Sequence, residues 1–123
     1  MIRPILHCVL IQNGLHFYYS LYRIVVERLS SKKVTVRKRA SSSSPCGMSH
    51  AQLRYGYSAA RNSGDNCYIA AEFASVEPGQ MFIVGDNKTY GGFYNAPLLQ
   101  AGNYHVWFGV FITVDGVSCG LFL

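Results

Sequence analysis

The stretch of residues 103–123, NYHVWFGVFITVDGVSCGLFL, decides the fold class. Between Asn103 and Val114 the side chains alternate in the period of a β-strand. One predicted face carries Tyr104, Val106, Phe108 and Val110, and the other carries His105, Trp107, Gly109 and Phe111. Asp115-Gly116 is a typical two-residue hairpin turn, and it leads into a second strand over 117–123. A long strand followed by such a hairpin favours an all-β sandwich.

The alternation does not by itself say which face is covered. We expect the row that begins with Tyr104 to point into the core, so Trp107 and Phe111 point to the opposite face. Aromatic side chains of this size have two interpretations there. In the first, they are exposed and form an adhesive surface. In the second, which we favour, a neighbouring strand or the insertion covers them.

Working outward, three more stretches predict short strands. Leu21–Leu29 alternates around β-branched residues, Cys67–Phe73 is a continuous apolar run, and Met81–Val84 lies between two turns. Gly92–Ala96 is short and aromatic and ends at a proline, which is typical of an edge position. The chain therefore reads as one β-sandwich domain.

Two segments do not fit that sandwich. Residues 32–66 are basic and rich in serine and have no sustained period, so we expect a long disordered insertion. Residues 1–17 are left as an unassigned leader or stray segment. The domain is then 18–123, incomplete at its N-terminus.

The positive charge of the chain is confined to its first half. The net charge is +5 over 123 residues, and ten of the eleven Lys and Arg, with one of the six acids, lie in residues 1–61. Five of these cations cluster between Lys32 and Arg39, directly before a serine run, which is typical of a solvated loop. The alternative is a small basic intracellular protein that binds nucleic acid through residues 32–61.

The residues that carry chemistry form no catalytic or metal-binding pattern. The four cysteines lie far apart with no zinc-finger spacing, so we expect no metal site and no cofactor. They allow up to two disulfides, and the pairing of Cys8, Cys46, Cys67 and Cys119 stays open. None has an arginine six residues later, so the phosphate-binding loop of tyrosine phosphatases is absent from this sequence. We expect no enzyme and no small-molecule substrate.

A tyrosine corner is predicted at the start of the last long strand. Leu98 precedes Tyr104 by six residues, which is the spacing found in immunoglobulin-like sandwiches. The neighbouring motifs are Tyr68-Ile-Ala-Ala-Glu-Phe73 and Val84-Gly-Asp-Asn-Lys-Thr-Tyr-Gly-Gly-Phe-Tyr-Asn-Ala-Pro-Leu98. With them, the stretch from Ser20 to Cys119 resembles the membrane-proximal fibronectin type III domain of receptor-type tyrosine phosphatases, closest to the class that also carries a MAM domain.

This resemblance implies an extracellular, noncatalytic module with an adhesion and spacer role, as a fragment of a larger receptor at the plasma membrane. Partners would be homophilic or other cell-surface proteins, and the membrane would be reached only through other parts of the receptor. The family's proprotein cleavage site corresponds here to the basic insertion, where only the dibasic pair Lys38-Arg39 matches, so we note a protease-sensitive site. Asn87-Lys88-Thr89 is an N-glycosylation sequon on a predicted turn.

Overall fold

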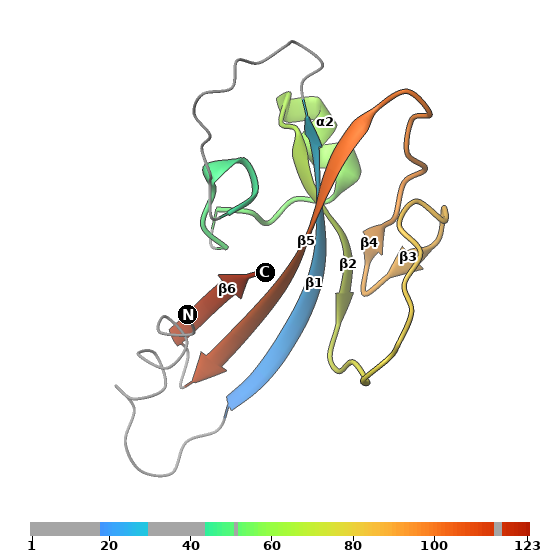
Figure 1. The fold of residues 1–123 in the computed structure, drawn as a ribbon. Coiled ribbons are helices and arrows are strands. Elements are labelled where there is room, and N and C mark those ends of the chain that lie inside the picture. The colour runs from blue at the N-terminus through green and yellow to red at the C-terminus, as the bar shows by residue number, and fades with distance from the viewer. Residues whose placement is uncertain (1–17, 30–43, 51, 115–116) are drawn as a thin grey trace.

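The computed structural model describes residues 18–29, 44–50, 52–114 and 117–123 (Figure 1). The main sheet has four antiparallel strands in the order β2-β1-β5-β6, and a second sheet pairs β3 with β4. The elements are β1 (Tyr18–Leu29), the 3₁₀ turn η1 (Pro45–Gly47), α2 (Tyr57–Ser63), β2 (Cys67–Phe73), β3 (Thr89–Tyr90), β4 (Phe93–Tyr94), β5 (Asn103–Val114) and β6 (Val117–Phe122). Two antiparallel sheets with little helix confirm the predicted all-β, immunoglobulin-like class.

The long strands β1 and β5 form the centre of the main sheet. They pair over their whole length, from Tyr18 opposite Val114 to Leu29 opposite Asn103. Figure 1 shows the two strands twisting together through the middle of the molecule. The strands predicted over 21–29, 67–73, 103–114 and 117–123 are thus confirmed. The predicted turn residues 115–116, and the incomplete N-terminal part over 1–17, lie outside the described residues.

The strand predicted over Met81–Val84 is wrong. The segment is a loop that ends in a turn, and the side chains of Met81 and Ile83 are 84% and 66% exposed. The carbonyl of Ile83 accepts a hydrogen bond from Nδ2 of Asn95 at 2.8 Å. A side chain far along the chain has therefore taken a backbone group that a strand would have offered to its neighbour.

A bulge in β2 sets which residues face each other across the sheet. The register between β1 and β2 shifts between Ile24 and Val25, so that Ile24 lies opposite Ala71 and Val25 opposite Ile69. The shift brings Glu72 opposite Arg23, and Nε of Arg23 donates to a carboxylate oxygen of Glu72 at 2.7 Å. Without the bulge, Ala71 would lie opposite Arg23 in place of Glu72, and this ion pair would not form.

The face of the sheet that carries Trp107 and Phe111 is covered. These two side chains are only 8% and 5% exposed, whereas Val106, expected in the core row, is 44% exposed. Trp107 packs in a cluster with Val25, Leu53, Cys67 and Ile69. The interpretation that the insertion covers these aromatics is confirmed. Val106 is corrected to a partly exposed position, because β6 pairs only with residues 109–114 of β5 and, in the described part of the chain, leaves the strand edge at Val106 without a neighbour.

The insertion is ordered over much of its length. The expectation of disorder over residues 32–66 is wrong for residues 44–50 and 52–66, and residues 32–43 lie outside the described part. Helix α2 buries Ala60 and ends at Gly64, whose φ of 78° gives the left-handed cap. A bridge between Gly56 and Ile69 joins this segment to β2. These residues are ordered because they contact β2 and β5. Such contacts between distant segments leave no periodic pattern in the local sequence.

Candidate functional site

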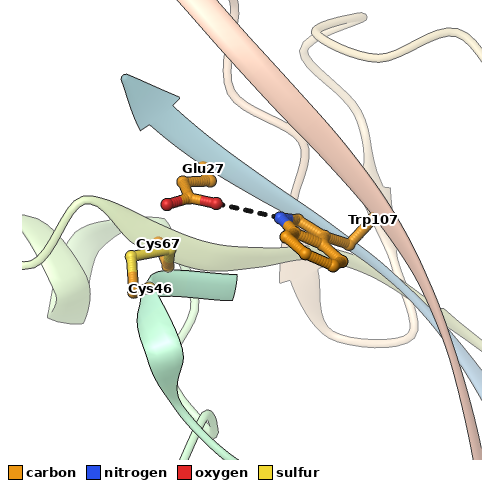
Figure 2. The surroundings of a disulfide bond; sticks show 4 residues. All are labelled: Glu27, Cys46, Cys67 and Trp107. Carbon is orange, nitrogen blue, oxygen red and sulfur yellow. Dashed lines mark hydrogen bonds between the residues drawn. A yellow bond between two sulfur atoms is a disulfide. The ribbon is translucent and has the colours of Figure 1, made fainter. Parts of the chain in front are cut away.

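A disulfide joins the insertion to the edge of the main sheet (Figure 2). It links Cys46, exposed in η1, to Cys67, the buried first residue of β2, with 6.2 Å between their Cα atoms. The sequence left this pairing open. Cys8 and the side chain of Cys119 lie outside the described residues. The bond fixes residues 44–50 over the face that carries Trp107.

Close to the disulfide, the side chains of Trp107 and Glu27 form a hydrogen bond with each other. Nε1 of Trp107 donates to Oε1 of Glu27 at 3.0 Å, and Figure 2 shows Glu27 on the side of the indole that faces the disulfide. Glu27, Cys46 and Cys67 are the one group of possible metal ligands in the part of the chain that the structure describes. The joined sulfurs cannot bind a metal as thiolates, so this arrangement is a structural joint.

The hydroxyl of Tyr104 reaches back to the loop before its strand. It accepts a hydrogen bond from the backbone N–H of Leu99 at 3.0 Å. Leu98 is half-buried against the second core cluster, which contains Val26 and Tyr68. A Cβ at Gly102 would lie 2.8 Å from the Tyr104 ring, so the loop needs glycine there to let the ring turn back.

The Asn87 sequon lies on a turn that Asn95 holds from inside. Asn95 is 1% exposed. Its Oδ1 accepts from the N–H of Gly85 at 2.8 Å, and its Nδ2 donates to Oδ1 of Asp86 at 2.9 Å. Asn87 itself is exposed, with φ at 71°, and its Oδ1 accepts from the Tyr94 hydroxyl at 2.5 Å. Sequence reasoning missed Asn95 because nothing in its local pattern marks it as buried.

The acid of the same turn is held in its charged form. The Tyr90 hydroxyl donates to Oδ2 of Asp86. This hydrogen bond is the main reason that the pKa of Asp86 lies below its ordinary value, and the backbone N–H of Lys88 also contributes. The turn therefore combines a rigid, hydrogen-bonded interior with an exposed asparagine at its tip.

The two histidines in the part of the chain that the structure describes pack against aromatic rings. Among the histidines in the described part, His50 stacks on Phe111 and His105 lies against Trp107, each with ring centroids 4.8 Å apart. Burial, and then the charge of Arg23, lower the pKa of His50. The proposed protease-sensitive pair Lys38-Arg39 lies outside the described residues.

Two comparisons with known proteins found similar sequences. The model of the family "Receptor-type tyrosine-protein phosphatase U Fn3 domain" matches residues 9–118, a match that begins earlier than the stretch from Ser20 that carries the resemblance. The chain is also similar to a Drosophila melanogaster protein named "Putative inactive tyrosine-protein kinase Wsck", with 38% identity over 73 residues, which is 55% of this chain and 9% of that protein. The chain thus spans a small part of this relative. In the described residues, the helices are too short and too polar to cross a bilayer.

Proposed function

The chain belongs to the fibronectin type III domain family of receptor-type tyrosine-protein phosphatase U, and we propose that it is a noncatalytic adhesion and spacer module on the outer side of the plasma membrane. The observation that carries the proposal is the family match over residues 9–118. The described structure supports it, because the Cys46–Cys67 disulfide is a bond that persists in oxidising compartments.

The adhesion role has a direct test in bead clustering. Beads coated with the full chain, secreted from mammalian cells, should cluster with each other or bind cells, while beads coated with an unrelated secreted β-sandwich should stay dispersed. Clustering by beads coated with heat-denatured chain would show adsorption of unfolded protein rather than adhesion. Dispersed beads at every density would reject the adhesion role and leave the spacer role.

We propose further that Asn87 carries an N-linked glycan. Its side chain is exposed on a turn, where a glycan can project into solvent. The secreted chain should lose mass on treatment with an N-glycosidase. Thr89→Ala should abolish this shift and Thr89→Ser should keep it, since both leave Asn87 in place. An unshifted parent protein would reject the proposal.

The same preparation tests the nucleic-acid alternative. Within the segment assigned to it, the described residues 44–50 and 52–61 pack on the sheet through side chains such as Leu53 and Ala60, which are 2% and 1% exposed. We expect the chain to pass a nucleic-acid column at physiological salt. Tight retention with a steep salt dependence would favour the alternative.

A further inference from the structure

A polar cavity of about 290 Å³ opens where β1 ends and β2 begins. Helix α2 and the loop before β5 close its other sides. The lining side chains that carry polar groups are Arg28, Arg61, Tyr57, Tyr68, Tyr104, Asp65 and Asn66. None of the functions argued above uses this cavity, although Tyr104 also forms the corner with Leu99.

Three tyrosine hydroxyls in this cavity have hydrogens to donate. The Tyr57 hydroxyl accepts from Nη1 of Arg61 at 2.9 Å, and the Tyr104 hydroxyl accepts from the Leu99 N–H at 3.0 Å. Tyr68 is 7% exposed, and its hydroxyl has no hydrogen-bond partner among the residues that the structure describes. Burial raises the pKa of Tyr68 to about 12, so its proton stays in place at neutral pH.

The charges around the cavity add to this excess of donors. Arg61 and Arg28 both line it, and Arg28 makes no ion pair within the described part of the chain. Asp65 is the one acid in the lining. A buried hydroxyl without a partner costs free energy, and guanidinium groups bind oxyanions with strong, charge-assisted hydrogen bonds. A ligand that brings several acceptor oxygens would offer partners to the Tyr68 hydroxyl and to the guanidinium groups that line the cavity.

We propose that this cavity binds a tetrahedral oxyanion of the sulfate class, either the free ion or the sulfate group of a glycan. The donors come from three neighbouring strands of the main sheet, β1, β2 and β5, and from helix α2, so they lie in two layers. A tetrahedral group presents acceptor oxygens to both layers, whereas a flat carboxylate presents them in one plane. A second cavity of about 360 Å³ shares Arg28 and Leu99 with the first and leaves room for the sugar. Only the glycan source rests on the proposed extracellular function.

The test measures binding to the full chain by calorimetry, with sodium sulfate at constant ionic strength and, separately, with a heparin hexasaccharide. Arg28→Gln and Arg61→Gln should each weaken sulfate binding about tenfold or more, as expected for loss of a charge-assisted hydrogen bond. Tyr68→Phe should weaken binding with no loss of melting temperature, because the hydroxyl has no partner in the protein to lose.

Arg54→Gln is the matched control, since Arg54 is an exposed arginine that does not line the cavity and makes the same change in net charge. It should leave sulfate binding unchanged. Equal losses in all three arginine variants would overturn the proposal by showing unspecific charge attraction, and so would an absence of sulfate binding. Hexasaccharide binding that depends on Lys38 and Arg39 but not on Arg28 would overturn the glycan as the source of the sulfate group. Sulfate binding without hexasaccharide binding would support the site and assign it to the free ion, whatever the location of the protein.

Discussion

Breaking the Cys46–Cys67 bond should lower the free energy of unfolding by roughly 3 kcal/mol. The two cysteines are 21 residues apart. Releasing a loop of this size returns chain entropy to the unfolded state worth roughly 3 kcal/mol at room temperature. Cys46→Ala removes the link at an exposed position and leaves the buried Cys67 sulfur in its packing. The Cys46→Ala/Cys67→Ala double variant should lose roughly 1 kcal/mol more, since it also removes that buried sulfur.

The chain contains its own reporter for this experiment. Trp107 is the one tryptophan, is 8% exposed, and packs in the same cluster as Leu53 beneath the segment that the disulfide holds. Urea unfolding followed by its fluorescence gives the free energy for parent and variants. A loss below about 1 kcal/mol in Cys46→Ala would refute the reasoning, since packing alone would then hold the cover.

Three further predictions follow from single side chains. Tyr104→Phe should destabilise the domain by roughly 1 kcal/mol, because a backbone N–H loses its acceptor, and an unchanged urea midpoint would count against the corner. Asn95→Ala should cost at least about 2 kcal/mol because it removes a fully buried amide together with its hydrogen bonds to the Gly85 N–H and the Ile83 carbonyl, and a change within about 0.5 kcal/mol would contradict the assigned role. Burial raises the pKa of Tyr68 from 10.0 to about 12 because it penalises the ionised form in the folded state, so the stability of the domain is unaffected by this group below pH 10 and falls as the pH rises from 10 toward 12. Tyrosinate absorbance and unfolding at stepped pH measure this, and a Tyr68→Phe variant with the same alkaline loss would refute it.

The strands could be predicted from sequence because their cause is local. Alternation and β-branched residues mark Leu21–Leu29 and Asn103–Val114, and the structure has strands over both. Alternation defines two faces but does not say which one the rest of the chain covers. Trp107 and Phe111 are buried by a segment that a disulfide holds in place, and neither the pairing nor the position of that segment can be derived from a period.

The buried residues of the candidate sites could not be predicted from sequence for a related reason. Asn95 and Tyr68 have their roles because residues distant in the chain surround them, and no residue type or spacing nearby signals this. The sequon, by contrast, is a contiguous motif and could be read directly, as could the spacing of Leu98 and Tyr104. What sequence reasoning found was therefore local chemistry, and what it missed was the contact between segments.

The most direct test of the extracellular assignment is a peptide map of the full chain, read by mass spectrometry without reduction. The chain is expressed in mammalian cells whose secretory pathway is functional. The account predicts a peptide in which Cys46 and Cys67 are linked and a glycan on Asn87, because both modifications are made in the secretory pathway. A chain retained in the cytosol, with free thiols at Cys46 and Cys67 and an unmodified Asn87, would contradict it.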